Sequence, residues 1–325
     1  MRFMYYSSRS TFTYATLVAL LSAQANVFAK TEAYINLSEI ARLYSMHLRM
    51  HKNKIILANK YNTLEFEIKG RRSWINGSMF WLHKPSQRLG RSWCITKEDF
   101  NFGIDPILRS YTHLSKRLPK IIVIDPGHGG KDSGAIGSKR LQEKQVVLDI
   151  SHKIKKGLEL HGFKVILTRY DDSYPSLEDR IVLTKKVKAD LFLSIHADGA
   201  TSESANGVET FISTLAGFDS SNHYGENGDK SIVSNNRFNA ENAILGFAIQ
   251  SNLLKTSKRS DRGVRRARFF VTRNAPCPAA LIECGFLTNL KEEKLLSTDL
   301  YRSKVAHGIV NGIRAYRTLV SRVRD

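Results

Sequence analysis

The pattern of apolar and polar positions changes near residue 120 of this 325-residue chain. Before that point, short runs alternate between the two kinds of residue, as in Leu64-Glu65-Phe66-Glu67-Ile68, which is typical of strands with one buried face. Residues 35–44 instead space their apolar side chains as a helix does. Asn76-Gly77 separates two of the alternating runs and predicts a hairpin turn, because both residue types tolerate positive φ. We therefore predict a small, mostly β module over residues 30–107.

From Lys120 onward, apolar strands alternate with amphipathic helices. The continuous apolar run at 121–124 is typical of a parallel strand that is buried on both faces. We predict further strands at 163–168, 191–196, 208–212, 269–272 and 280–283, and helices at 142–160, 176–187, 240–254 and 290–319. This alternation predicts an α/β domain over residues 119–325, with a mostly parallel sheet and helices on both faces. Residues 108–118 are polar and basic and are interpreted as a linker.

The first 29 residues have the organisation of a secretory signal peptide. Their only charges are Arg2 and Arg9, and an apolar run over residues 11–21 follows. Small residues two apart then allow cleavage after Ala25 or Ala29. Polar residues at 22, 24 and 26 interrupt the run before the roughly 18 apolar residues that a membrane span needs. We expect export to the periplasm or cell envelope and no transmembrane span in the mature form; an uncleaved anchor is the alternative.

The formal charge of +20 favours an anionic partner: nucleic acid, a membrane face or an acidic cell-surface polymer. Export argues against nucleic acid. Residues 30–118 hold 16 basic and 7 acidic residues, so we expect this basic module to contact an anionic envelope surface; a merely solvated basic surface is the alternative. Three cysteines, Cys94, Cys277 and Cys284, are too few for a disulfide-dense scaffold, and their odd number leaves at least one free thiol. We expect Cys277 and Cys284 to be buried free thiols; a Cys277–Cys284 disulfide is the alternative.

Four candidate functional residues follow predicted strands or begin a helix. His128 lies in a glycine-rich turn after the first strand of the α/β domain, and Glu143 begins the next helix. His196 and Glu283 each end a strand. Because the carboxyl ends of parallel strands share one edge of a sheet, these side chains could converge. Two histidines and one carboxylate form a zinc-ligand set that leaves a position for water, and Glu283 could then act as general base and acid.

Each of these residues also has a structural alternative. A histidine in a glycine-rich turn is commonly held by backbone hydrogen bonds, and a glutamate at a helix N-terminus is favourable with the helix dipole whatever its function. His196 could be a satisfied buried histidine, and Glu283 could pair with one of the many arginines.

A set of motifs, in order between Lys120 and Tyr316, resembles the zinc-dependent N-acetylmuramoyl-L-alanine amidases of bacterial envelopes. The motifs are Asp125-Pro126-Gly127-His128-Gly129-Gly130, Glu143-Lys144, Thr168-Arg169, Leu177-x-x-Arg180, Ser194-Ile195-His196-Ala197-Asp198, Gly207-Val208-Glu209-Thr210, Arg262-Gly263-Val264 and Leu281-Ile282-Glu283-Cys284-Gly285-Phe286. The resemblance implies that His128, Glu143 and His196 bind Zn²⁺ and that Glu283 is the catalytic glutamate. It also implies hydrolysis of the amide between N-acetylmuramic acid and L-alanine in peptidoglycan, during wall remodelling or daughter-cell separation.

The chain departs from the family pattern at two places. Asp198 stands where asparagine is frequent. Between Ile212 and Ala240, where some relatives carry a helix that occludes the site, this chain has no long apolar helical period, so we predict a surface loop. The alternatives to an amidase are another zinc-dependent amide hydrolase of the wall, such as a stem peptidase or a deacetylase, and a non-catalytic wall-binding protein.

The small module resembles the domain at the N-terminus of copper amine oxidases and of some envelope proteins. The residues that carry this resemblance are Gly70, Arg72, Ile75, Asn76 and Gly77. It implies neither a catalytic residue nor copper.

Overall fold

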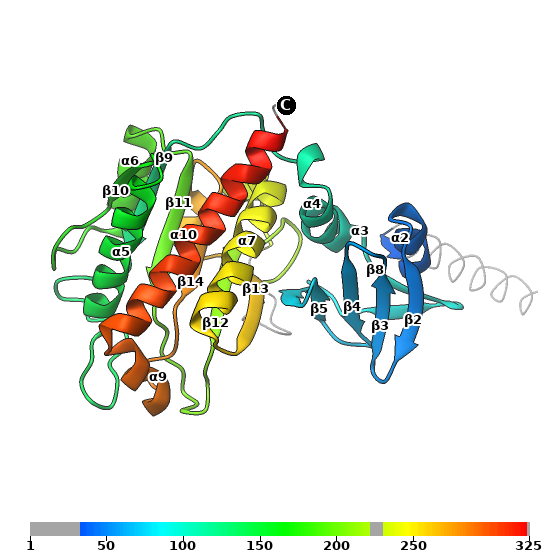
Figure 1. Ribbon diagram of the computed structural model, residues 1–325, viewed down its shortest axis with the longest axis horizontal. Coiled ribbons are helices and arrows are strands. Elements are labelled where there is room, and N and C mark those ends of the chain that lie inside the picture. Colours follow the sequence, from blue (N-terminus) through cyan, green and yellow to red (C-terminus); the bar gives the residue numbers. More distant parts are fainter. Residues whose placement is uncertain (1–32, 222–229, 324–325) are drawn as a thin grey trace, which may run out of the picture.

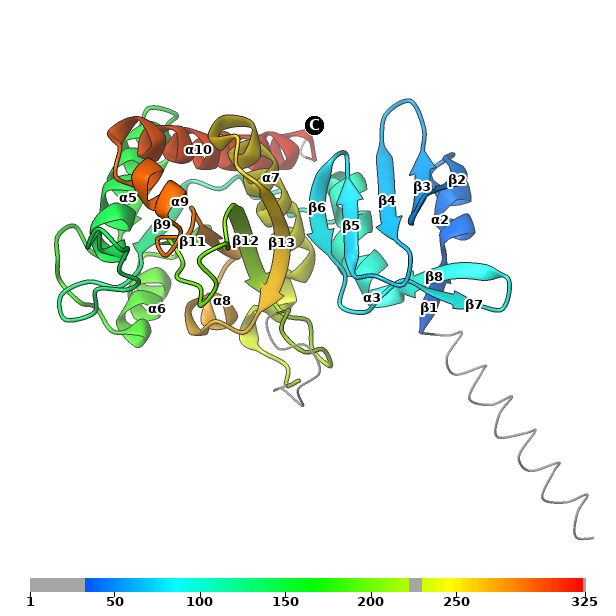
Figure 2. The same ribbon diagram turned by 90° about the horizontal axis from the view of Figure 1, so that it is seen from below.

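The computed structural model describes residues 33–221 and 230–323, which form two units side by side (Figures 1 and 2). The predicted signal peptide, residues 1–29, lies outside the described residues. Within the described ranges, no helix combines the length and the apolar character needed to cross a membrane.

The N-terminal unit is a strand meander packed on short helices. Its elements are β1 (Tyr34–Asn36), α2 (Leu37–Leu43), β2 (His47–His51), β3 (Lys54–Ala58), β4 (Thr63–Glu67), β5 (Arg72–Ile75), β6 (Ser78–Trp81), β7 (Gln87–Leu89), β8 (Ser92–Thr96), α3 (Lys97–Asp99), a π-helical turn η1 (Phe100–Ile104), α4 (Asp105–Leu108) and η2 (Ser110–Thr112). Strands β2 to β6 pair antiparallel in chain order, while β1, β8 and β7 form a second sheet. Asn76 and Gly77 have positive φ, which confirms the predicted turn between β5 and β6.

The second unit has the predicted α/β architecture. Its elements are β9 (Ile121–Pro126), α5 (Glu143–Glu159), β10 (Lys164–Leu167), α6 (Leu177–Lys186), β11 (Leu191–His196), β12 (Val208–Ser213), η3 (Ser234–Phe238), α7 (Asn239–Ser257), β13 (Asp261–Ala267), α8 (Phe270–Asn274), β14 (Ala279–Glu283), α9 (Leu290–Leu296) and α10 (Asp299–Arg322). The strand order is β10-β9-β11-β14-β12-β13, and of these pairs only β12–β14 is antiparallel. Helices α5, α7 and α10 cover one face and α6 and α8 the other (Figure 2), which confirms the predicted fold class.

One predicted element was wrong. The segment 269–272 is not a strand, because α8 begins at Phe270, and the neighbouring strand is β13. The sequence of β13, Asp-Arg-Gly-Val-Arg-Arg-Ala, has no apolar pattern that predicts a strand. Its Arg266 is buried and its Arg265 half-buried, because Phe102 and Glu209, far away in the chain, provide acceptors for them. The segment 290–319, predicted to be mostly helical, is confirmed as two helices, since Thr298 caps α10 by accepting a hydrogen bond from the Tyr301 backbone N–H.

The sheets of the two units are continuous. β6 lies parallel to β13, with Phe80 opposite Val264, so that β2 to β6 extend the sheet of the second unit to eleven strands. The chain between the units is also packed: Asp105 accepts hydrogen bonds from Tyr44, from Arg109 Nε at 2.7 Å and from His113 Nε2 at 2.7 Å.

Candidate metal and catalytic site

The four predicted site residues meet at one edge of the sheet. His128 follows β9, His196 ends β11, and Glu143 begins α5. His196 and Glu283 are register partners on the parallel strands β11 and β14. All four line one pocket of about 520 Å³. The parallel topology therefore produces the convergence that the sequence predicted.

Three of the four offer ligand atoms that could hold one metal ion. The donor atoms of His128, Glu143 and His196 all lie within 4.8 Å of one another, and they are the only such group among the described residues. His128 Nε2 is 3.1 Å from Glu143 Oε2, and His196 Nδ1 is 3.0 Å from Glu143 Oε1. Two imidazole nitrogens and one carboxylate suit a catalytic zinc site, in which a fourth position stays open.

The residues around the donor atoms also fit a metal centre. His128 Nδ1 hydrogen-bonds Asp132 Oδ2 at 2.8 Å, which orients the ring so that Nε2 faces the other donors. Gly134 has φ +64°, and a Cβ there would lie 2.6 Å from Glu143 Oε2. Any side chain at position 134 would therefore clash with the Glu143 carboxylate, so glycine at this position leaves room for the donor atoms.

The Glu143 carboxylate is fixed on both oxygens. Its Oε2 accepts a hydrogen bond from the Ala135 backbone N–H and its Oε1 from that of Ala197, each at 2.9 Å. Burial alone would raise the pKa of Glu143, but hydrogen bonds with His128 and His196 hold it well below its usual value. The carboxylate is therefore ionised, as a metal ligand must be.

The loop that carries His128 is clamped by buried polar groups. Asp125, 1% exposed, accepts hydrogen bonds from Arg180 Nη1 at 2.6 Å, Thr168 Oγ1 at 2.6 Å and Ser194 Oγ at 2.8 Å. The Arg180 guanidinium also donates to the carbonyl oxygen of His128 at 3.0 Å. Because His128 itself has a positive φ of 58°, these contacts hold a backbone conformation that a non-glycine residue rarely adopts.

A second arginine completes the clamp. Arg169, 2% exposed, donates from Nε to the Pro126 carbonyl oxygen at 3.1 Å and from Nη2 to that of Gly127 at 2.7 Å. Gly127 in turn makes room for the second histidine, since a Cβ there would lie 2.3 Å from His196 Cε1.

Glu283 has one carboxylate oxygen that lacks a hydrogen-bond partner. It is 6% exposed, and its Oε2 makes no hydrogen bond within the described residues. Burial raises the pKa of Glu283 well above its usual value, and the nearby charges of Asp198, Glu143 and Glu209 raise it further. A buried carboxyl group with a raised pKa is suited to general acid–base work.

Some functional residues were missed in the sequence. Asp132 was not identified as the partner of His128, although its place four residues after a histidine in a glycine-rich turn is a usable signal. Arg169 and Arg180 stood in the recognised motifs without an assigned role. The apolar wall of the pocket was also missed, because it comes from separate elements; it includes Leu177, Phe269, Phe270, Val271 and Leu281.

The sequence predicts a surface loop and no occluding helix between β12 and α7. The described part of this segment likewise contains no long helix. Residues 214–221 and 230–238 contain only the short 3₁₀ helix η3; residues 222–229 lie outside the described residues. All three cysteines are free and buried, which confirms the prediction for Cys277 and Cys284.

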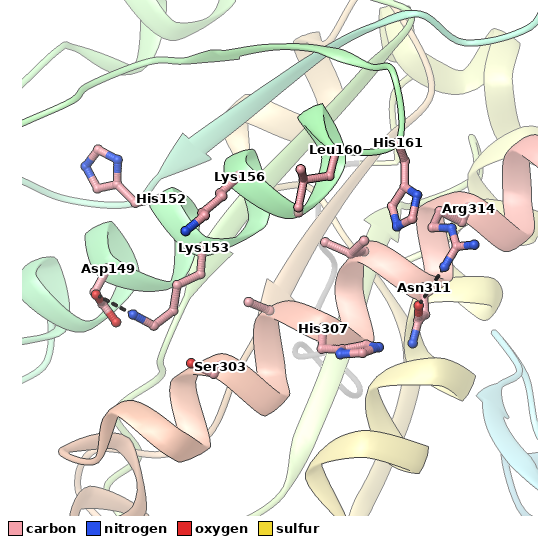
Figure 3. Close-up of a pocket in the computed structure, with 13 residues that line it drawn as sticks. Asp149, His152, Lys153, Lys156, Leu160, His161, Ser303, His307, Asn311 and Arg314 are labelled. Carbon is pink, nitrogen blue, oxygen red and sulfur yellow. Dashed lines mark hydrogen bonds and ion pairs between the residues drawn. The ribbon is translucent and has the colours of Figure 1, made fainter.

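A larger groove of about 620 Å³ lies elsewhere, between α5 and α10 (Figure 3). Its walls include the basic side chains Lys153, Lys156 and Arg314, and its acid Asp149 lies 3.0 Å from Lys153 Nζ. The groove shares no residue with the pocket around Glu283. It contains no metal-ligand group within the described residues, so the chemistry belongs to the smaller pocket.

Comparison with known proteins agrees with this geometry. Residues 122–315 match the family model described as N-acetylmuramoyl-L-alanine amidase. The chain is 36% identical over 226 residues to N-acetylmuramoyl-L-alanine amidase AmiA of Salmonella typhimurium, a match that covers 62% of this chain and 76% of the relative. It is 34% identical over 221 residues to AmiC of Escherichia coli, covering 61% of this chain and 53% of the relative.

Solved structures show the same relationship. The catalytic domain of CwlV, an N-acetylmuramoyl-L-alanine amidase from Bacillus (Paenibacillus) polymyxa, is 32% identical and superimposes with a TM-score of 0.52, covering 62% of this chain and 99% of that one. The N-acetylmuramoyl-L-alanine amidase from Clostridium difficile 630 is also 32% identical and superimposes with a TM-score of 0.52. This match covers 62% of this chain and 97% of that one.

Proposed function

The chain belongs to the N-acetylmuramoyl-L-alanine amidase family and hydrolyses peptidoglycan, and we propose that it does so with a zinc ion bound by His128, Glu143 and His196 and with Glu283 as general base and acid. The observation that carries the proposal is the meeting, in one pocket, of this ligand set and a buried glutamate whose Oε2 has no hydrogen-bond partner among the described residues. No comparable constellation occurs elsewhere in the described residues.

Each residue has a defined task in cleavage of the amide between the lactyl group of N-acetylmuramic acid and L-alanine. Bound zinc supplies Lewis-acid chemistry, since it polarises a carbonyl and lowers the pKa of water toward about 7. Asp132 holds His128 in the tautomer that leaves Nε2 free to bind the metal. Glu283 accepts the proton of the attacking water and delivers it to the leaving nitrogen of L-alanine. The apolar wall of the pocket limits the access of further water.

The decisive experiment is mass spectrometry of purified sacculi after digestion. Release of free stem peptides that begin with L-alanine supports the amidase, whereas cuts within the stem or loss of acetyl groups would refute it. A Glu283→Ala variant should retain zinc and lose activity. If metal analysis finds no zinc in the active protein, the ligand assignment is wrong.

We further propose that the protein is exported to the periplasm or cell envelope, where it acts in wall remodelling or daughter-cell separation. The charged n-region, the apolar run and the small residues before position 30 support export. N-terminal sequencing of the mature protein tests this, and a sequence that begins at Met1 would contradict it.

Residues 30–107, 108–118 and 119–325 are proposed as module, linker and catalytic domain, and the basic module as a contact to an anionic envelope surface. Its charge supports this role, because basic surfaces attract anionic polymers in a salt-dependent way. Co-sedimentation of residues 30–118 with purified walls is the test, and binding that does not weaken with salt would contradict it.

A further inference from the structure

The N-terminal unit meets the catalytic unit through a close strand pair. β6 is three strands from β14, which corresponds to about 14 Å at the usual strand spacing. Gly263 has φ +87°, and a Cβ there would lie 3.0 Å from Met79 Cβ, so only glycine allows this approach. The Met79 backbone N–H donates to Asp261 Oδ2 at 2.7 Å, and Trp81 Nε1 donates to the Arg262 carbonyl oxygen at 2.8 Å. β6 therefore fixes the first residues of β13.

One side chain of the module reaches an arginine of the catalytic unit. The guanidinium of Arg265 lies 4.6 Å from the ring centroid of Trp81. Arg265 is only 18% exposed, so this cation–π contact is largely shielded from water. The same guanidinium extends toward Glu209 on β12, with Arg265 Nε 3.0 Å from Glu209 Oε2.

Glu209 is a buried carboxylate that depends on two arginines. It is 2% exposed, and Arg262 Nε lies 3.3 Å from the same oxygen that Arg265 approaches. Arg262 is itself held on the ring of Phe286, 4.5 Å from its centroid. A buried carboxylate without such partners carries a large desolvation penalty, so loss of either arginine forces Glu209 to move or to admit water.

Glu209 stands directly opposite Glu283. The two are register partners in the antiparallel pair β12–β14, which places their side chains on the same face of the sheet. Glu209 Oε2 has only its ion pairs with the two arginines, and Glu283 Oε2 has no hydrogen-bond partner among the described residues. A displacement of Glu209 would therefore change the position and surroundings of the Glu283 carboxylate opposite it.

We propose that the N-terminal unit is a working part of the catalytic site, in which Trp81 and Arg265 are positioning residues that hold Glu209 and, through it, Glu283. The inference rests on the proposed role of Glu283. The module would thus have a role in catalysis that is independent of any adhesion to the envelope.

Trp81→Ala and Arg265→Met test the proposal, with Trp74→Ala as the matched control. Trp74 is the other tryptophan on the β5–β6 hairpin, and its cation contacts are Lys54 and Arg72, within the module. On a soluble disaccharide–stem-peptide substrate, the two test variants should lower kcat about tenfold, because a small displacement of a catalytic group is costly. KM and zinc content should stay at the wild-type values, and Trp81→Phe, which keeps an aromatic face, should recover much of kcat.

The double variant gives a second readout. If Trp81 acts through Arg265, the Trp81→Ala/Arg265→Met protein should be no slower than the worse single variant. Additive losses, a raised KM with unchanged kcat, or kcat equal to that of Trp74→Ala in a folded protein would each overturn the proposal. If Trp81→Ala fails to fold, the kcat of Arg265→Met still tests the proposal, because this variant leaves the β6–β13 backbone contacts in place. A wild-type protein that releases no L-alanine stem peptides would instead overturn the proposed function.

Discussion

The clamp on the His128 loop allows one prediction to be worked out in detail. Arg180→Met removes the guanidinium that donates to Asp125 Oδ1 at 2.6 Å, to the Pro126 carbonyl oxygen at 2.8 Å and to the His128 carbonyl oxygen at 3.0 Å. Methionine keeps an unbranched apolar side chain, so the change mainly deletes the charge. It leaves Asp125, which is 1% exposed, without its ion-pair partner.

The cost follows from what remains around Asp125. Breaking a buried ion pair from one side costs about 3–5 kcal/mol. The hydrogen bonds from Thr168 and Ser194 survive, so we expect the lower end, about 3 kcal/mol. The free energy of unfolding of a typical domain is about 5–15 kcal/mol, so a loss of about 3 kcal/mol is a large share of it. Zinc affinity should also fall about 10–100-fold, because the backbone around a ligand is released.

The assay is urea unfolding in the presence of a chelator, so that bound metal adds nothing to stability. The matched control is Arg117→Met, which removes an ion pair at 2.7 Å to Asp190 from a side chain that is 73% exposed. That variant should lose less than about 1 kcal/mol. Asp125→Asn/Arg180→Met should be more stable than Arg180→Met alone, because it contains no unpaired charge. An Arg180→Met protein that unfolds like the control would refute the clamp.

Three further predictions use other parts of the molecule. Glu283→Gln should lower kcat about 10²–10⁴-fold while zinc stays bound, because the amide cannot exchange a proton; single-turnover kinetics and metal analysis check this, and unchanged turnover would remove Glu283 from the mechanism. Asp132→Asn should weaken zinc binding about 10–100-fold, measured by competition with a chelator, since His128 loses its orienting carboxylate; a stronger loss of turnover than of zinc would contradict this role. For Asp105, burial would raise the pKa, but hydrogen bonds from Arg109, Tyr44 and His113 lower it overall, so its stabilising effect is present above the unfolded pKa of about 4 and is lost as the pH falls through the lower folded value. Asp105→Asn should therefore be less stable than wild type at pH 7, with the gap closing in acid; thermal melts across pH show this, and a constant gap would disprove it.

The helices and strands with strong periodicity could be predicted from the sequence. The buried run at 121–124 became β9, and the stripe from Val146 to Leu158 became the inner face of α5. The ligand set was also predictable, because its residue types stand at strand ends and at a helix start. Local patterns decide these features, so no knowledge of distant contacts is needed.

β13 shows where local patterns fail. Its three arginines predict exposure, yet Arg266 is 2% exposed and donates to the carbonyl oxygens of Ser213 and Phe102. Both acceptors are far away in the chain, and burial of the charge is possible only once they are in place. The same holds for Arg265, whose partners Glu209 and Trp81 come from two different units.

The sequence by itself determined the α/β alternation, the two histidines and two glutamates of the site and the basic character of the module. The tertiary structure alone decided that β6 joins β13, that Glu209 faces Glu283 and that two buried arginines clamp the His128 loop. The physical reason is the range of the interactions. Side-chain periodicity is a property of neighbouring residues, whereas strand register and the pairing of buried charges depend on segments as much as 182 residues apart, which meet only when the chain has folded.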